Sequence, residues 1–319
     1  MLRFVLRRLV GMAMVLFVVS ILVFLIFNVI PNSPPAQRLA GKNATPVLVK
    51  SIEEEWGFDE SLPAQYATMM KKVFTNELIQ YSPRTSVEDR IVEGIPATLS
   101  LSVGAGIIWL ALGLFLGYLS AIRAGGWLDR LLTGLAVAGI SIPVFLLAPV
   151  LIYFLSYKLE IFPNGGYVPL TEDPWEWLTH LVLPWFTLAV LSIGFYSRVL
   201  RSNMLDVMNE DYVRTARAKG LSERRVMTRH VLRNSLIPIT TLFGLDFGAT
   251  IAGTAIITEV LFNIEGIGSY AAESITKLEL PPIMGITLYG AFFVVFINAL
   301  VDVAYAYLDP RVRLGASAQ

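Results

Sequence analysis

The sequence contains no cysteine and only two histidines, and only 16% of its 319 residues are charged. The lack of cysteine excludes disulfides, cysteine-ligated zinc and thiol catalysis, and it leaves the redox compartment undetermined. His180 and His230 are too few and too far apart in sequence to form a histidine-rich metal site. The formal net charge is zero, so no field of the whole molecule favours nucleic acid. We therefore expect neither a metal nor a nucleic-acid partner.

The motifs of nucleotide and hydrolase chemistry are absent as well. The sequence has no Gly-x-x-x-x-Gly-Lys-Ser/Thr phosphate loop, no His-Glu-x-x-His and no Gly-x-Ser-x-Gly. We expect a non-catalytic chain without a cofactor. If ATP drives its activity, partner subunits must bind the ATP and Mg²⁺ and hydrolyse the nucleotide.

What the sequence has in abundance is apolar residues, which make up 55% of the chain, and the mean hydropathy is +0.62. They concentrate in six segments, most of them of the ~17–25 residues that a membrane-spanning helix needs. The first is a retained span and not a cleaved signal peptide, because its uncharged run is too long for one. The composition predicts an all-α membrane protein with six transmembrane helices. The segments are roughly 9–30, 96–122, 131–157, 181–197, 236–262 and 283–308.

The basic residues predict the orientation. Sixteen of the 25 lysines and arginines lie at the two termini, in the 123–130 connection or in the loop 198–235, which all fall on one side of the membrane. By the positive-inside rule both termini and this loop are cytoplasmic. The domains expected are residues 1–30 with the first span, an extracytoplasmic insertion 31–95, and a core 96–319 that contains the cytoplasmic loop. Within the insertion, apolar residues at helical spacing near 63–78 predict an amphipathic helix.

Three carboxylates lie within or at the ends of apolar segments, namely Asp246, Glu259 and Asp302. Carboxylates at such depth face the interior of a helix bundle or a wet cavity. They are candidates for a translocation path, which would favour a stand-alone secondary transporter or channel. The alternative is that each is a structural hydrogen-bond partner.

The basic loop is the most informative segment. Glu210 and Asp211 give an acidic start that suits a helix N-terminus, Gly220 interrupts the helix, and Ser222 can cap a second, basic helix that leads into the fifth span. A short helix joined to two spans can transmit movement from a cytoplasmic partner. The same composition fits a basic stop signal that only sets topology, and composition alone leaves the two interpretations about equal.

Several motifs resemble those of one family. The stretch DYVRTARAKGLS at 211–222, followed by RHVLRNSLIP at 229–238, is similar to the coupling loop of dipeptide/oligopeptide ABC importer permeases. The N-terminal MLRFVLRR with NVIP at 28–31, WGFDESLP at 56–63, IPATL at 95–99, FPNGG at 162–166 and LDPRVR at 308–313 resemble further motifs of that family. The N-terminal pattern is similar to the B-type subunit of a B/C pair of permeases.

The resemblance implies a type I importer fold in the inner (plasma) membrane of a prokaryote. It implies these partners: a second homologous permease in a heterodimer, two ATP-binding subunits, an external solute-binding protein, membrane lipid and a peptide cargo. Relatives in this family also carry nickel, glutathione or oligosaccharides. By resemblance, the contacts with the ATPase are Glu210, Tyr212, Arg214, Thr215, Ala216, Ala218, Lys219, Gly220 and Ser222. Arg214 departs from the wider superfamily, which has glutamate there.

Overall fold

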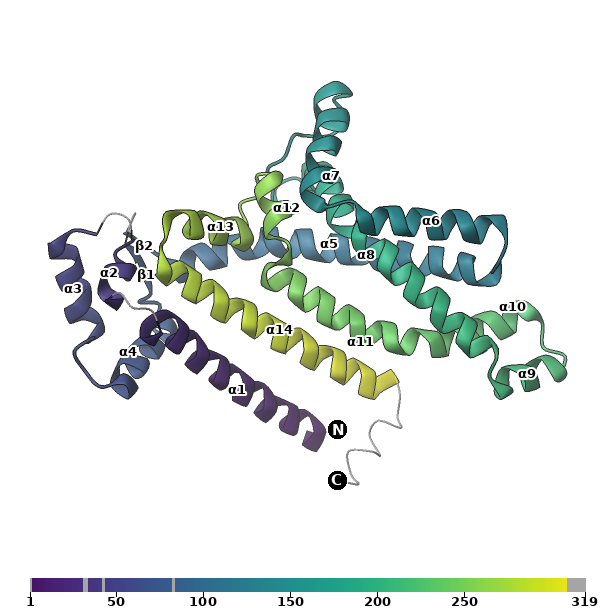
Figure 1. The fold of residues 1–319 in the computed structure, drawn as a ribbon, viewed down its shortest axis with the longest axis horizontal. Helices are drawn as coiled ribbons and strands as arrows, with labels where there is room; N and C mark the ends of the chain where they lie inside the picture. The colour runs from purple at the N-terminus through teal and green to yellow at the C-terminus, as the bar shows by residue number, and fades with distance from the viewer. Residues whose placement is uncertain (1, 31–33, 42–43, 82–83, 309–319) are drawn as a thin grey trace. The chain divides into compact units, whose positions relative to one another are not determined.

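The computed structural model describes residues 2–30, 34–41, 44–81 and 84–308, with the side chains of 2–5 and 301–308 left out. Its regular structure is helical apart from one antiparallel hairpin, β1 (Ile79–Tyr81) and β2 (Arg84–Ser86), in which Gln80 pairs with Thr85 (Figure 1). The helical class predicted from the sequence is confirmed.

Five helical stretches are long and apolar enough to cross a membrane, and a bent pair raises the number to six. The six predicted apolar segments are therefore confirmed, and the third of them is the bent pair. It consists of α6 (Trp127–Ser141) and the helical stretch Val144–Lys158, bent by 99° to each other. The other five stretches are Leu6–Val29, Val87–Ile122, Pro174–Met208, Glu223–Thr254 and Leu280–Leu300.

The bend has a local cause. Pro143 disfavours helical geometry in the residue before it, and Ile142 is extended, with φ −87° and ψ 116°. The second half of the pair continues as α7 (Val144–Leu151) and the π-helical stretch η3 (Ile152–Lys158). The fourth predicted segment, 181–197, proves to be the middle of a 35-residue helix, α8 (Pro174–Met208).

Packing divides the chain into two compact units, and α5 (Val87–Ile122), α11 (Arg233–Ala249) and α14 (Leu280–Leu308) contribute to both. The first unit comprises Met1–Leu99 and Gly248–Leu300. Its remaining helices are α1 (Leu2–Phe24), η1 (Leu25–Val29), α2 (Pro35–Leu39), α3 (Pro46–Trp56), α4 (Leu62–Phe74), η5 (Thr250–Thr254), α12 (Ile256–Leu261) and α13 (Ile267–Lys277).

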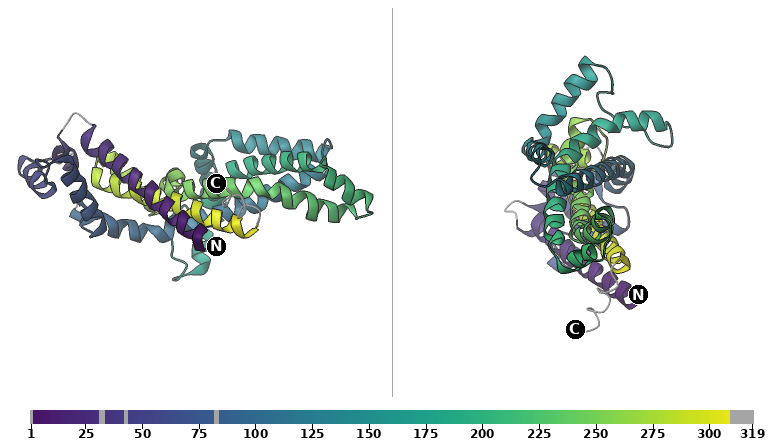
Figure 2. Two further views of the ribbon diagram at one scale, coloured as in Figure 1. Left: turned by 90° about the horizontal axis from the view of Figure 1, so that it is seen from below. Right: turned by 90° about the vertical axis from the view of Figure 1, so that its right-hand side faces the viewer.

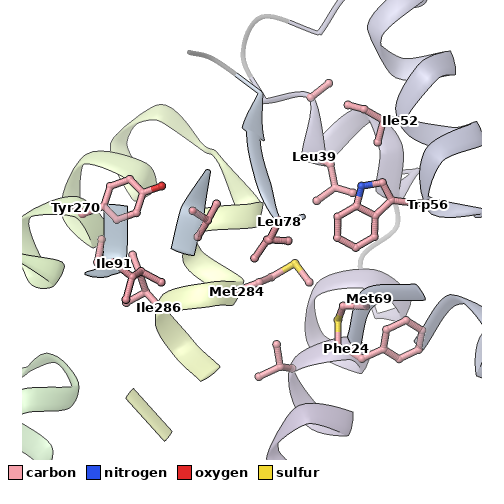
Figure 3. Packing of buried hydrophobic residues seen from close by; sticks show 14 of the residues in the cluster. Phe24, Leu39, Ile52, Trp56, Met69, Leu78, Ile91, Tyr270, Met284 and Ile286 are labelled. Atoms are coloured by element: carbon pink, nitrogen blue, oxygen red, sulfur yellow. The ribbon is translucent and has the colours of Figure 1, made fainter. Parts of the chain in front are cut away.

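The core of the first unit joins the insertion to the C-terminal helices (Figure 3). Trp56, Met69 and Leu78 from the insertion are almost fully buried in one cluster with Tyr270 of α13 and Met284 of α14. Burial of Met69 confirms the amphipathic helix predicted there, which is α4. The insertion therefore folds on α13 and α14 and has no separate core in the described part of the chain.

The second unit comprises Ser100–Phe247 and Val301–Gln319. Within it α6 and α8 lie side by side (Figures 1 and 2). The two helices approach closely at Gly194, where an added Cβ would come within 2.5 Å of the Ala136 carbonyl oxygen. Between α8 and α11 the chain forms α9 (Asp211–Ala218), α10 (Glu223–Arg225) and the π-helical stretch η4 (Val226–Leu232).

Candidate functional site

The basic loop leaves the fourth span and returns to the fifth through one short helix, α9. We call residues 210–223 the coupling segment. The chain reverses at Gly220, whose φ of +77° lies in the left-handed region that glycine enters without steric cost. The helix, glycine bend and second helix predicted from the sequence are therefore confirmed.

The side-chain cap predicted for Ser222 is wrong. Ser222 does occupy the position before α10, and its carbonyl oxygen accepts hydrogen bonds from the backbone amides of Arg225 (2.9 Å) and Val226 (3.0 Å). Its side chain makes no capping hydrogen bond and is exposed. The hydroxyl of Ser222 is thus available to a partner.

The inner face of α9 holds the coupling segment on the body of the second unit. Val213 is fully buried and Ala216 is 6% exposed, one helical turn apart, where α9 packs on η4 and α8. The Asn234 side-chain amide donates to the Tyr212 hydroxyl at 2.7 Å. This bond ties the first turn of α9 to the start of α11, which continues into the fifth span.

An ion pair closes the glycine bend. The guanidinium of Arg217 donates to both carboxylate oxygens of Glu223, at 2.8 and 3.1 Å. The carboxylate raises the pKa of Arg217 above its ordinary value, through the hydrogen bonds and then the charge. The Arg217 side chain is 38% exposed and that of Glu223 is 60% exposed, so solvent screens the pair and its contribution to stability is small. The pair joins the last turn of α9 to the first residue of α10 across the bend.

The outer face carries most of the residues assigned to docking by resemblance. Arg214 forms an exposed ion pair with Asp211 at 3.6 Å, and the Thr215 hydroxyl donates to the Asp211 carbonyl at 2.9 Å. Of the predicted set, Ala216 alone faces inward. The exposed members are Glu210, Tyr212, Arg214, Thr215, Ala218, Lys219, Gly220 and Ser222.

Sequence reasoning missed Arg217, Glu223 and Asn234 as members of the site. The signal for the first two was present, since opposite charges six residues apart flank a single glycine. Asn234 gave no local signal, because its partner Tyr212 lies 22 residues earlier.

Asp246 lies in the same unit and links the two long helices that the coupling segment joins. The hydroxyl of Tyr196 on α8 donates to Asp246 Oδ2 on α11 at 2.8 Å. Tyr196 is fully buried, and the rings of Trp109, Phe243 and Phe247 cluster beside it. This arrangement favours the structural alternative for Asp246.

Glu259 belongs to the first unit and is also engaged. Its Oε1 accepts from the Thr98 hydroxyl at 2.8 Å, and its Oε2 accepts from the Ser269 backbone amide at 2.8 Å. The same Thr98 oxygen accepts from the Ile267 amide at 2.9 Å. Glu259 and Thr98 thus cap the N-terminus of α13, where unpaired amides and the helix dipole favour a carboxylate.

The remaining predictions concern Asp302 and metal binding. Asp302 lies outside the residues whose side chains are described, so the path predicted through Asp246, Glu259 and Asp302 stays a prediction. Across the described residues, no group of three or more histidine or acidic side chains is arranged to hold a metal ion.

Family comparison decides what kind of protein carries this segment. Residues 113–314 match the model of the binding-protein-dependent transport system inner membrane component family, and residues 1–102 match its N-terminal region. Together the two models cover nearly the whole chain. The chain is a permease of this family. Its place in the inner membrane as a multi-pass protein follows, as the apolar segments predicted.

Curated relatives of the permease align over almost their full length. A peptide transport system permease protein of Brucella abortus is 36% identical over 97% of this chain and 98% of its own. The dipeptide transport system permease protein of Bacillus subtilis is 36% identical over 98% and 99%. The glutathione transport system permease protein of Escherichia coli is 34% identical over 98% and 99%. The resemblance to peptide permeases is confirmed.

A solved structure confirms the fold of the permease. The inward-facing MetNI methionine ABC transporter contains a chain that matches with a TM-score of 0.50, at 16% identity, over 70% of this chain and 95% of that one. At this identity the match shows the type I importer fold and no more. Membership of a binding-protein-dependent ABC family implies two kinds of partner for the permease, an ATPase and a substrate-binding protein.

Proposed function

We propose that this permease is the transmembrane subunit of an ATP-driven importer of di- and oligopeptides, and that it forms the translocation path with a second, homologous permease. Two ATP-binding subunits and an external solute-binding protein complete the assembly. The chain itself performs no catalysis. The observation that carries the proposal is α9, a short helix that is fixed on one face and exposed on the other.

The attachment of α9 supports a role in transmitting force. Val213 and Ala216 pack the helix on η4, and the Asn234–Tyr212 hydrogen bond fastens it to α11. Arg217 and Glu223 hold the glycine bend. A rigid-body movement of α9 would therefore be transmitted to α11, which continues into the fifth span. It would also be transmitted to α8, which contains the fourth span. We assign contact with the ATPase to the exposed face, above all to Arg214, Lys219 and Ser222.

The proposed cargo rests on the relatives. The named relatives transport peptides, a dipeptide or glutathione, which is itself a tripeptide. Peptide is thus the chemical class that these names share. The local hydrogen bonds of Asp246 and Glu259 give no support to a stand-alone transporter driven by protons.

Cross-linking tests the docking assignment directly, because the chain lacks cysteine and an introduced thiol is its only one. Lys219→Cys, on the outer face of α9, is expected to cross-link to the ATPase subunit through a thiol–amine reagent in the assembled importer. Trp127→Cys is the matched control, since Trp127 is 75% exposed and follows another connection predicted to be cytoplasmic.

Equal cross-linking yields from the two positions would refute docking at α9. Uptake of a labelled dipeptide into liposomes tests the function itself. It should require ATP, the ATPase and the binding protein. Proton-driven uptake by the purified chain alone would instead establish the secondary transporter.

A further inference from the structure

An open pocket of about 490 Å³ lies between α6 and α8 of the second unit. Arg198, Arg201 and Ser202 line it from α8, at spacings of three and four residues that place them on one helix face. Thr133 of α6 faces them, and Phe195 and Ile140 form an apolar wall. The pocket thus combines two guanidinium groups and two hydroxyls with an apolar side.

The two arginines are in different states. Arg201 donates from Nε and Nη2 to the two carboxylate oxygens of Asp129, at 2.7 and 2.8 Å. Asp129 is 4% exposed and also accepts from the Ser120 hydroxyl and the Gly125 amide, so Arg201 is fixed in position. Arg198 is exposed and has no hydrogen-bond or ion-pair partner among the described residues. An anion in the pocket would pair with Arg198 and with the remaining donors of Arg201.

The pocket lies at the level of the cytoplasmic head groups, given the predicted orientation. Asp129 is the third residue of α6, directly after the 123–126 connection, and it fixes the height of Arg201. Arg201 precedes the end of α8 at Met208 by seven residues, or ~10 Å at ~1.5 Å rise per residue. Trp127 is 75% exposed at the same end of α6, a common position for a residue at the membrane interface.

Charge and hydrophobicity point to the same ligand. The charged residues at this end of α6 and α8 have a net charge of +2, from Arg123, Arg130, Arg198 and Arg201 against Asp129 and Asp206. Of the apolar side chains that line the pocket, Phe195 is 41% exposed. Guanidinium groups bind phosphate oxygens in fixed, two-pronged geometry. The cytoplasmic leaflet offers phosphates attached to acyl chains.

We propose that this pocket binds the phosphodiester head group of an anionic phospholipid, with Arg198 as the main contact and the apolar wall beside the acyl chains. The site does not depend on which solute the importer carries. Anionic lipid would then be a specific ligand of the permease as well as part of the bilayer that surrounds it.

The amount of lipid that stays bound to the purified permease tests the proposed site. The full chain is extracted from vesicles of equal parts phosphatidylethanolamine and phosphatidylglycerol, and native mass spectrometry records the lipid that remains bound. Arg198→Gln should lower the retained phosphatidylglycerol by at least about fivefold, the effect of one basic contact of ~1 kcal/mol. The control is Arg130→Gln, whose guanidinium lies outside the pocket lining and donates to the Gly125 carbonyl at 3.4 Å. An equal loss in both variants, or no loss in either, would overturn the proposal.

Photo-cross-linking identifies the occupant. Phe195→p-benzoylphenylalanine in the assembled importer should yield adducts enriched in phosphatidylglycerol over the bilayer composition. The same replacement at Phe115, which is 58% exposed on α5, should yield adducts that follow the bilayer composition. A Phe195 adduct with another protein subunit, or one that is displaced by inorganic phosphate or a dipeptide, would contradict a lipid site.

Discussion

Glu259 in the first unit and Asp129 in the second are both buried carboxylates, 0% and 4% exposed, but they are stabilised by different donors. Glu259 accepts hydrogen bonds from neutral groups, a hydroxyl and backbone amides at the start of α13. Asp129 accepts a two-pronged ion pair from Arg201 in addition to neutral donors. The first arrangement distributes the negative charge over a helix end, whereas the second depends on one opposite charge.

The pockets beside the two carboxylates also differ in the charge of the residues that line them. A pocket of about 500 Å³ beside Glu259 is lined by Glu93, Glu265 and Glu273, with Arg90 as its basic residue. The pocket beside Asp129 and Arg201 has the two arginines and no acidic residue in its lining. The external side predicted from the basic residues is thus acidic at Glu259, and the predicted cytoplasmic side is basic.

The largest effect on stability is expected from breaking the ion pair between Arg201 and Asp129. Arg201→Gln leaves Asp129 buried without its compensating charge, which should lower the stability of the permease by ~3–5 kcal/mol. Thermal unfolding of the purified protein in detergent measures it. The double variant Arg201→Gln/Asp129→Asn removes both charges and should recover most of the loss. If the double variant is no more stable than the single one, the charge of Asp129 is not the cause.

A smaller loss is expected in the first unit. Thr98→Val deletes the hydroxyl that donates to Glu259 and accepts from the Ile267 amide, while the remaining amide bonds to Glu259 persist. Removing a partner from buried polar groups costs ~1–3 kcal/mol. Thr98→Ser is the control, because it keeps the hydroxyl. The same unfolding measurement should rank Thr98→Val between wild type and Arg201→Gln, and a rank below Arg201→Gln would refute the contrast between the two carboxylates.

These two clusters also mark the limit of prediction from the sequence. Hydropathy located all six apolar segments, and the spacing of Met69 and its neighbours located α4, because both signals are local. The partner of Asp129 lies 72 residues away and that of Glu259 lies 161 residues away, so only the folded chain brings them together. The break at Ile142–Pro143 was not predicted, because a proline in an apolar run can end a helix, kink it or leave it intact. Packing decides which of these occurs. The helix, glycine bend and second helix of the coupling segment were predictable because their signals are local, whereas the Asn234–Tyr212 bond, 22 residues apart, was not.

The smallest effect on stability, and the sharpest on function, is expected at Gly220. Gly220 and Gly125 have nearly the same φ, +77° and +78°, and an added Cβ at either would meet nothing within 4 Å. Alanine at either position therefore costs the same left-handed strain, ~1–2 kcal/mol, and both variants should show the same modest shift in unfolding. Only Gly220 lies in the proposed contact with the ATPase, so Gly220→Ala should reduce ATP-dependent dipeptide uptake well below that of Gly125→Ala at equal protein levels. Equal uptake would mean that the bend at Gly220 serves the fold alone, and the force would then have to enter through another part of the cytoplasmic surface.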